Sequence, residues 1–248
     1  MNKRQIEILN IISRESQINV TELAKIFGVS EVTIRKDLRQ LDKEGMIKRM
    51  HGGAMLVTDD NISNRLCLNY DVKKRIAREA SKLVKDGETV MIESGSTAAI
   101  LAKELSKKQN ITIITNSLFI VNYIKKCPNI QIITLGGILQ KNSEVFVGPL
   151  VKYALEGIYV DKFFIGVDGF SEKNGFTSAD VMRAEMVRTM AKKADKLIVI
   201  TDSSKFGVKG PVHLVNLDEV NTIITDSNIE KKYIDLFTSH SVNLITVD

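Results

Sequence analysis

The chain has 248 residues, of which 35 are Lys or Arg, 30 are Asp or Glu, three are His and two are Cys. Its 44% hydrophobic and 26% charged residues are typical of a globular protein, which excludes a disordered, collagen-like or disulfide-stapled chain. The length favours two domains or one large one. No apolar run approaches the roughly 18–20 residues that cross a bilayer, and the first residues lack the pattern of a secretory signal. We therefore expect a cytoplasmic protein without a membrane partner.

The two cysteines, Cys67 and Cys127, have neither metal-ligand nor redox spacing, so we expect reduced thiols, no metal and no cofactor. The net charge of +5 is unevenly distributed. Residues 1–56 hold ten Lys and Arg against seven Asp and Glu, whereas residues 57–248 hold 25 against 23. The positive excess therefore lies mainly in the first quarter of the chain, which weakly favours a nucleic-acid partner there.

The first quarter is predicted to contain three short helices and a hairpin. The apolar spacing indicates a first helix over residues 3–13. Thr21 is a candidate cap for a second helix, which Gly28 ends. Ser30 is a candidate cap for a third helix that runs to Glu44, before Gly45. A strand at 46–50 and a hairpin tip at 51–54 follow.

The third helix has the composition of a DNA-recognition helix. If Ile34, Leu38 and Leu41 face the core, a rotation of about 100° per residue turns a polar and cationic face outward. Such a face can enter the major groove of a DNA duplex. The candidates are Ser30, Val32, Thr33 and Lys36 for base edges, Arg35 and Arg39 for phosphates, and Lys48, Arg49 and His51 on the hairpin, or wing. The alternative is a helical scaffold whose charges, among them Asp37, are merely solvated.

The remainder of the chain reads as an α/β domain. Periodicity is lost over residues 55–70, so we predict a winged helix-turn-helix over 1–56, a linker over 57–70 and an α/β domain over 71–248. Strands and helices then alternate, which predicts a mainly parallel sheet between helix layers. The expected strands are 89–93, 112–115, 131–134, 162–166, 197–201, 222–225 and 243–247, and the expected helices are 71–84, 98–106, 117–126, 149–155, 179–194 and 228–238.

Small polar residues follow several of these strands, where ligands bind in open α/β sheets. Ser94, Gly95, Ser96 and Thr97 can offer hydroxyl and helix N-terminal N–H groups to a phosphate. Lys205 supplies a cation on a later strand-end loop. Asn116, Asp168 and the Gly136-Gly137 pair could face a sugar. Taken singly, the Ser94–Thr97 loop is better explained as a capped strand–helix turn, Asp168 as a turn residue and Lys205 as a surface lysine. Asn116 is as well explained as a helix cap, and Gly136-Gly137 as a tight turn.

The motifs together resemble one family. Residues 5–9, 20–38 and 41–54, ending in Met50-His51-Gly52-Gly53-Ala54, look like the winged helix-turn-helix of the DeoR-type bacterial transcriptional regulators. The strand-end motifs from Ser94 to Gly207 resemble, in order, the sensor domain of the same family. The resemblance implies a repressor of a carbohydrate-utilisation operon that binds double-stranded operator DNA as a homodimer or homotetramer.

The sensor domain of that family is similar to ribose-5-phosphate isomerase, so the resemblance also implies a phosphorylated sugar as effector. It assigns Ser94 to Thr97 and Lys205 to the phosphate, and Asn116, Gly136 with Gly137, Asp168 and Gly169 to the sugar side. Two positions depart from the pattern. Family members often have Asp in place of Glu93 and Arg in place of Gln140. Glu93 could do no more than reshape the strand end. Gln140 could indicate a different sugar headgroup, or Lys141 could take over the role of the arginine.

The alternative is a sugar-phosphate isomerase fused to a DNA-binding module. Isomerisation needs a general base and acidic groups near the sugar oxygens. The isomerases resemble Val-Asp-Gly-Ala-Asp-Glu at their acidic loop, where this chain has Ser171 instead of the second Asp. Their Gly-rich Lys-Gly-Gly-Gly run is replaced here by residues 173–178. Because binding motifs persist while proton-transfer motifs do not, we expect a sensor rather than an enzyme. A third hypothesis is an interaction module whose pocket binds nothing.

Overall fold

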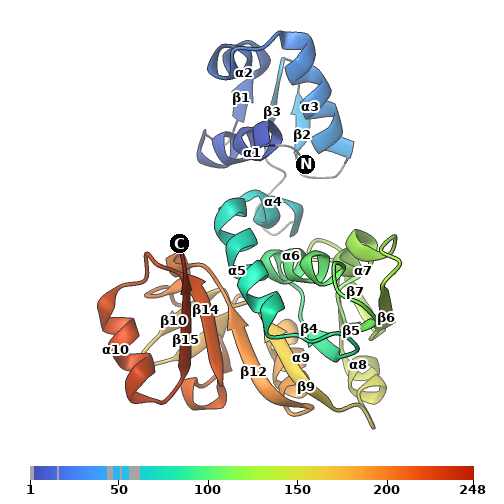
Figure 1. Ribbon diagram of the computed structural model, residues 1–248, viewed down its shortest axis with the longest axis vertical. Coiled ribbons are helices and arrows are strands. Elements are labelled where there is room, and N and C mark those ends of the chain that lie inside the picture. Colours follow the sequence, from blue (N-terminus) through green and yellow to red (C-terminus); the bar gives the residue numbers. More distant parts are fainter. Residues whose placement is uncertain (1–2, 16, 44–46, 51, 56–61) are drawn as a thin grey trace. The chain divides into compact units, whose positions relative to one another are not determined.

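The computed structural model describes residues 3–15, 17–43, 47–50, 52–55 and 62–248. Contacts within the chain divide it into two compact units, Met1–Asp71 and Val72–Asp248. Each unit is described by itself, with elements labelled as in Figure 1.

The first unit is a small helical domain with a three-stranded antiparallel sheet, in which β3 lies between β1 and β2. The predicted inward stripe of the third helix is confirmed, because Ile34, Leu38 and Leu41 are almost completely buried. The elements are α1 (Lys3–Glu15), β1 (Gln17–Asn19), α2 (Val20–Phe27), α3 (Glu31–Lys43), β2 (Lys48–Met50), β3 (Gly53–Met55) and α4 (Ile62–Cys67).

The ends of the helices follow local hydrogen bonding. Thr21 was predicted to cap the second helix, and this is wrong. The cap is Asn19, one residue before the helix starts, whose side chain accepts the N–H of Glu22 at 2.7 Å. Gly28 ends α2 with φ of 61°, as predicted. The Ser30 hydroxyl accepts the N–H of Thr33 at 3.3 Å, which confirms the third cap. Glu44, Gly45 and His51 lie outside the described residues.

The segment predicted as a linker, 57–70, contains a short helix, α4. Ile62 and Leu66 are buried, one helical turn apart, and α4 packs against α1. A single i, i+4 pair is too short a signal for periodicity to reveal. Residues 56–61 lie outside the described residues, and the next helix already begins at Tyr70.

The second unit is built on a seven-stranded parallel sheet with the order β15-β14-β12-β9-β4-β5-β6. All seven predicted strands belong to it. Their bounds are β4 (Thr89–Ile92), β5 (Ile111–Thr115), β6 (Ile130–Thr134), β9 (Val160–Ile165), β12 (Ala194–Ile200), β14 (Thr222–Asp226) and β15 (Asn243–Val247). The predicted helices correspond to α5 (Tyr70–Lys82), α6 (Ser96–Leu105), α7 (Leu118–Ile124), α8 (Pro149–Ala154), α9 (Val181–Ala191) and α10 (Lys231–Ser239).

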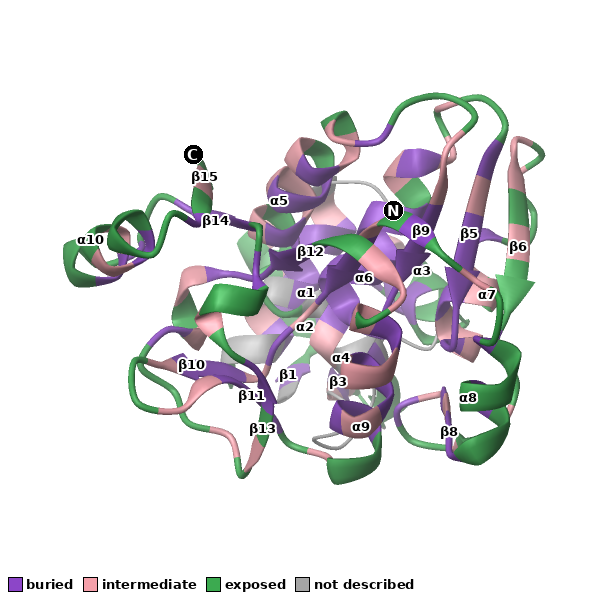
Figure 2. Ribbon diagram, turned by 90° about the horizontal axis from the view of Figure 1, so that it is seen from below, coloured by how far each residue is buried: buried purple, intermediate pink, exposed green. Residues whose placement is uncertain are grey.

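Five short antiparallel strands and two 3-10 turns were not predicted. They are β7 (Ile138–Gln140), β8 (Val145–Val147), β10 (Gly169–Ser171), β11 (Gly175–Ser178), β13 (Val212–Val215), η1 (Ser203–Lys205) and η2 (Leu217–Glu219). Apolar residues of α8, α9 and α10 pack in one core cluster with inward residues of the sheet. The central strands β4, β5 and β9 are largely buried, whereas the edge strands β6 and β15 are partly exposed (Figure 2).

The order of the strands creates a switch point. The chain runs from β4 to β5 and β6 on one side, then returns to place β9 on the other side of β4. In such sheets the loops at the carboxyl ends of the two central strands diverge to opposite faces, which opens a crevice for ligands. Here those loops begin at Glu93 after β4 and at Gly166 after β9.

An aromatic cluster holds the loop after β12 in place. Phe170 is central, with its ring centroid 4.6 Å from that of Phe176, 6.0 Å from Phe206 and 5.2 Å from Phe237. Phe206 directly follows η1, so burial of its ring anchors the segment that carries Lys205.

We expect Phe170→Ala to lower the free energy of unfolding by about 3–5 kcal/mol, because a buried aromatic side chain leaves a cavity. Urea unfolding of the second unit measures this. Phe119, half-buried on α7, is the matched control, and Phe119→Ala is expected to cost less. Equal losses in the two variants would contradict a central role for Phe170.

Candidate functional site

The outward face of α3 carries the residues predicted to meet DNA. Val32 is 70% exposed, and Lys36 and Arg39 are also exposed. Arg35 is exposed and pairs with Glu31 at 3.1 Å on the same helix. Of the remaining candidates, Ser30, Lys48 and Arg49 are exposed and Thr33 is half-buried, while His51 lies outside the described residues.

The wing is tied to the recognition helix, because the N–H of Arg49 donates to Asp42 Oδ1 at 3.4 Å. Asp37 was grouped with solvated charges, but it is 5% exposed and lies between α3 and α1. Arg4 Nε donates to its carboxylate at 2.6 Å, and Gln5 Nε2 donates at 3.1 Å. A buried carboxylate paired in this way fixes α3 on its scaffold. Sequence reasoning missed it because spacing does not distinguish a buried charge from a solvated one.

The loop after β4 enters α6 without a side-chain cap. Gly95 is the N-cap residue and makes no side-chain cap hydrogen bond, while Ser94, Ser96 and Thr97 are each 6% exposed. A Cβ on Gly95 would meet only Glu93 Oε2 at 3.6 Å and the Ala98 side chain at 3.8 Å. The first N–H groups of a helix attract anions, so this terminus keeps the features predicted for a phosphate site.

Glu93 shapes the strand ends at the switch point. Its Oε1 accepts the Ser94 hydroxyl at 2.6 Å, and its Oε2 accepts the N–H of Gly166 at 3.4 Å. The carboxylate therefore connects the carboxyl ends of β4 and β9. Of the interpretations left open for this position, the contacts support the reshaped strand end.

Asn116 lies at the end of β5, under the crossing strand β8. Its side-chain Nδ2 donates to the backbone carbonyl of Phe146 at 3.0 Å, and its backbone carbonyl accepts the Phe146 N–H at 2.8 Å. The residue is 2% exposed, and its Oδ1 has no hydrogen-bond partner within the described part of the chain. A buried acceptor without a donor is costly, so Oδ1 is a candidate acceptor for a ligand hydroxyl group.

Three predicted glycines have different surroundings. A Cβ on Gly137 would lie 2.6 Å from the Val147 carbonyl oxygen, and one on Gly169 would lie 2.3 Å from that of Val208. Close packing of backbone therefore explains both glycines without a ligand. Gly136 is exposed and has no neighbour within 4 Å of its ideal Cβ.

Asp168 and Lys205 occupy loops that carboxylates hold in place. Asp168 Oδ2 accepts the N–H of Ala179 at 2.8 Å, which fixes the entry to α9. Asp226, at the end of β14, accepts both the N–H and the hydroxyl of Ser203, at 2.7 and 2.8 Å. This fixes η1 and hence the half-buried Lys205. Burial acts to raise the pKa of Asp226, but hydrogen bonds from Ser203 and Asn228 outweigh it and lower the pKa overall.

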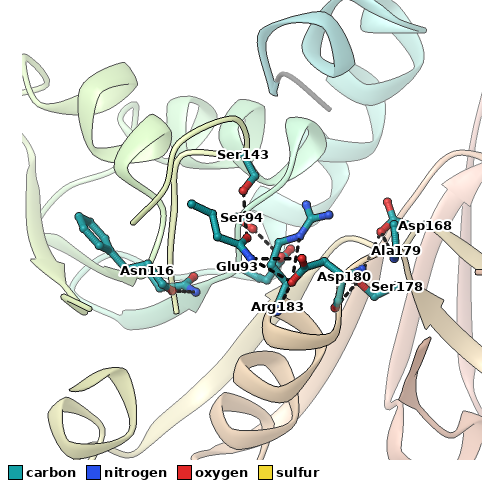
Figure 3. A network of polar contacts seen from close by, with 11 residues as sticks. Glu93, Ser94, Asn116, Ser143, Asp168, Ser178, Ala179, Asp180 and Arg183 are labelled. Carbon is teal, nitrogen blue, oxygen red and sulfur yellow. Dashed lines mark hydrogen bonds and ion pairs between the residues drawn. The ribbon is translucent and has the colours of Figure 1, made fainter. Parts of the chain in front are cut away.

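A further network joins β7 to the start of α9 (Figure 3). Gln140 Nε2 donates to both carboxylate oxygens of Asp180 at 3.2 Å, and its Oε1 accepts the Ser143 hydroxyl at 3.2 Å. Asp180 caps α9 by accepting the N–H of Arg183 at 2.7 Å. Burial acts to raise the pKa of Asp180, but these donors outweigh it and lower the pKa overall. Gln140 is therefore used within the chain, and Lys141 is exposed.

Sequence reasoning missed Arg183. Its side chain is only 8% exposed, and its Nε lies 4.0 Å from Asp180 Oδ1. Figure 3 places it in the network with Glu93, Ser94 and Asp180. Arg is rarely buried unless it is paired, but on a helix with several other charges the sequence alone does not single it out. Arg183 therefore brings a buried positive charge to this network.

The order of the sheet decides which of these groups lie together. The loops of Asn116, Ser94–Thr97 and Asp168 follow the adjacent strands β5, β4 and β9. With neighbouring strands about 4.8 Å apart, β12, which precedes Lys205, is about 10 Å from β4. The strand before Gly136, β6, is about 19 Å from β12 on the same spacing. One small ligand at the switch point can therefore contact the loops after β5, β4 and β9 together with Lys205. It can less readily contact Lys205 and Gly136 at the same time, because these two residues follow strands on opposite sides of the switch point.

Two other findings concern the described ranges. No group of three His, Cys, Asp or Glu side chains there is placed to hold a metal ion. No helix among those residues is long and apolar enough to span a bilayer.

Comparison with known proteins decides the family. A family model described as the DeoR C terminal sensor domain matches residues 68–227, and one described as the DeoR-like helix-turn-helix domain matches residues 4–60. The chain belongs to the DeoR family. It is a DNA-binding transcriptional regulator and not an enzyme, and the predicted fold class is confirmed: a winged helix-turn-helix followed by an α/β sensor domain with a mainly parallel sheet.

Several relatives match over almost their whole length. The HTH-type transcriptional regulator GolR of Listeria innocua is 36% identical over 92% of this chain and 92% of that protein. The HTH-type transcriptional repressor GlcR of Bacillus subtilis is 31% identical over 99% and 96%. A putative aga operon transcriptional repressor of Escherichia coli is 27% identical over 99% and 94%. Among solved structures, ribose 5-phosphate isomerase A of Methanocaldococcus jannaschii has a TM-score of 0.42 at 25% identity, covering 56% of this chain and 55% of that one.

We expect Asp226→Asn to destabilise the sensor domain by about 2 kcal/mol at pH 7, because the carboxylate accepts charge-assisted hydrogen bonds. The folded pKa is lowered, so this stabilisation is present above the unfolded value of about 3.9 and is lost as the pH falls through the folded value. Urea unfolding at pH 7 and near pH 3 should show the difference between wild type and variant shrinking at acid pH. Asp218→Asn, at an exposed position, is the control. A difference that is independent of pH would contradict the assignment.

Proposed function

We propose that this regulator represses a carbohydrate-utilisation operon and is released from its operator by a phosphorylated sugar. In this proposal residues 1–56 bind DNA, residues 57–70, which include α4, connect the two domains, and residues 71–248 sense the sugar. The protein acts as a homodimer or homotetramer in the cytoplasm, where the operator DNA lies, because operators are commonly read by symmetric dimers.

The observation that carries the effector proposal is the arrangement at the switch point. The uncapped N-terminus of α6, with the buried hydroxyls of Ser96 and Thr97, suits a phosphate. The buried Asn116 Oδ1 lacks a donor within the described residues, and a sugar hydroxyl would supply one. Both groups follow adjacent strands, β4 and β5. A sugar phosphate carries a phosphate anion and hydroxyl groups close together on one small molecule, so it matches both features.

The DNA-binding proposal is supported by the exposed face of α3. Val32 offers an apolar contact for a thymine methyl group, and Lys36 offers a donor for guanine. Arg39 and the wing residues Lys48 and Arg49 add positive charge for phosphates. Buried Asp37 holds this face on α1, so the recognition helix is presented by a rigid scaffold.

The two sites are proposed to communicate by linkage. The sugar phosphate binds better to one arrangement of the oligomer, and that arrangement spaces the two recognition helices wrongly for the operator. A coupling free energy of about 1–3 kcal/mol gives a 5–150-fold change in DNA affinity.

We expect Lys36→Ala to weaken operator binding by about 1–3 kcal/mol if the side chain reads a base, while effector binding is unchanged. If it contacts a phosphate instead, the salt dependence of binding should fall by about one unit of slope. Electrophoretic retention of the upstream DNA at several salt concentrations measures both. Lys126→Ala, an exposed change in the sensor domain, is the control. Unchanged affinity and salt dependence in Lys36→Ala would remove this residue from the interface.

We expect Lys205→Ala to keep operator binding but to need roughly 10–100-fold more sugar phosphate for release, since it loses one hydrogen bond to a charged group. A panel of sugar phosphates, scored by loss of DNA retention on the upstream region, finds the effector first. At 100 times its Kd a true effector should add about 2.7 kcal/mol of stability in a thermal-shift measurement.

The matched control is Lys209→Ala, four residues along the same loop and exposed. If Lys205→Ala abolished DNA binding in a folded protein, the division of roles between the domains would be wrong. If no phosphorylated sugar changed either stability or DNA retention, the effector proposal would fail, and an interaction module with an unoccupied pocket would be favoured.

A further inference from the structure

The sensor domain carries an exposed apolar patch that neither proposed site uses. Ile138 is 60% exposed and Leu139 37% on β7. Leu150 is 63% exposed and Tyr153 66% on α8, which Figure 2 shows as mostly exposed. Two further apolar side chains, Val181 at 63% and Met182 at 39%, begin α9. We call these six residues the apolar patch.

Close contacts connect the three elements of the patch. A Cβ on Gly148, the residue before α8, would lie 3.5 Å from Ile138 Cδ1, which places β7 beside the start of α8. Lys152 of α8 pairs with Glu185 of α9 at 2.5 Å. Gln140 at the end of β7 donates to Asp180, the cap of α9. The three elements that carry the six side chains are therefore neighbours in the sensor domain.

The size of the patch indicates a function. Its side chains expose on the order of 600 Å² of mainly apolar surface, the upper end of what a monomeric protein shows in one patch. A stable interface covers about 800 Å² on each partner, so the patch with a polar rim has the required size. By contrast, Tyr159 has over its ring Lys193, which lies beyond the C-terminal end of α9 and so at the opposite end of that helix from Val181 and Met182.

We propose that the apolar patch is a two-fold interface between the sensor domains of two copies of this chain. The occupant is a second copy for two reasons. Each chain has one helix-turn-helix, and a symmetric operator requires two. The charged residues that join α8 to α9, Lys152 and Glu185, neutralise each other, so this pair does not repel an identical patch in an isologous contact. This inference rests on the proposed function in one respect, namely that the regulator acts as a symmetric oligomer.

The patch is built on the elements that also hold the candidate effector site. The bond between Gln140 and Asp180 joins β7 to the start of α9, and Arg183 follows in the next turn. A ligand that shifts α9 relative to β7 would move Val181 and Met182 relative to Ile138 and Leu139. The interface thus lies where occupancy of the switch point can change how two copies dock.

The test introduces a charge on two different elements. Tyr153→Asp and Val181→Asp are compared with the wild-type full chain by sedimentation over a dilution series without DNA. Tyr159→Asp is the matched control, because Tyr159 is 75% exposed and lies outside the patch, with Lys193 over its ring. We expect each patch variant to weaken self-association by about 30-fold or more, the size typical of a central interface residue, and Tyr159→Asp to behave as wild type.

Circular dichroism and urea midpoints verify folding, which these exposed substitutions should leave unchanged; if one variant failed to fold, the other would still decide. A wild type that stays monomeric over the series, or patch variants that associate as well as wild type, would overturn the interface. The second outcome would leave the proposed regulator intact. Monomeric variants that bound operator DNA with wild-type affinity would instead support the interface and contradict the proposed symmetric reading of the operator.

Discussion

The sensor domain depends on a reversal in strand order. Because β9 returns to the free side of β4 instead of extending the sheet beyond β6, the loops after these two strands separate. Glu93 occupies the point of separation, accepting from Ser94 on its own strand and from Gly166 on the next. The uncapped end of α6 and the unused acceptor of Asn116 are available only because the strand ends are held in this position.

Aspartate carboxylates fix several loops and one helix start of the sensor domain. Asp168 fixes the entry to α9, Asp180 caps that helix, and Asp226 fixes η1. Each of them accepts N–H groups of the backbone, so each is already used by the fold. A general base for isomerisation needs a carboxylate that is free to take a proton from substrate. Asp168, the acidic residue that this chain keeps of the isomerases' acidic loop, is here part of the scaffold, as a domain that binds without turnover would have it.

The sequence predicted the parallel sheet well and the short strands badly. Runs such as Phe163-Phe164-Ile165 are apolar because both faces are covered, and this signal is strong and local. In contrast, β7, β8 and β10 have three residues each. They pair in short hairpins, β7 with β8 and β10 with β11, and three residues are too few for an alternating pattern to mark a strand. The same limit applies to the site: Ser94 to Thr97 could be predicted from a Gly and hydroxyls at a strand end, whereas the burial of Arg183 and Asp37 depends on tertiary contacts that spacing does not encode.

Asn19 replaced Thr21 as a helix cap because both are good caps within two residues, and only the backbone angle at the start of α2 distinguishes them.

The position of Gln140 connects the site to the surface. In the family that the sequence resembles, an arginine often occupies position 140, where its charge would face the ligand side of the strand ends. In this chain the neutral amide spans Asp180 and Ser143, and Arg183 on α9 adds a positive charge beside Asp180. A guanidinium carried by a helix moves with that helix, whereas one carried by a β-hairpin does not. Because the first turn of α9 also exposes Val181 and Met182, α9 carries both Arg183 and part of the apolar patch. A ligand that draws Arg183 toward an anion would then act on the outer surface directly, without a separate relay through the sheet.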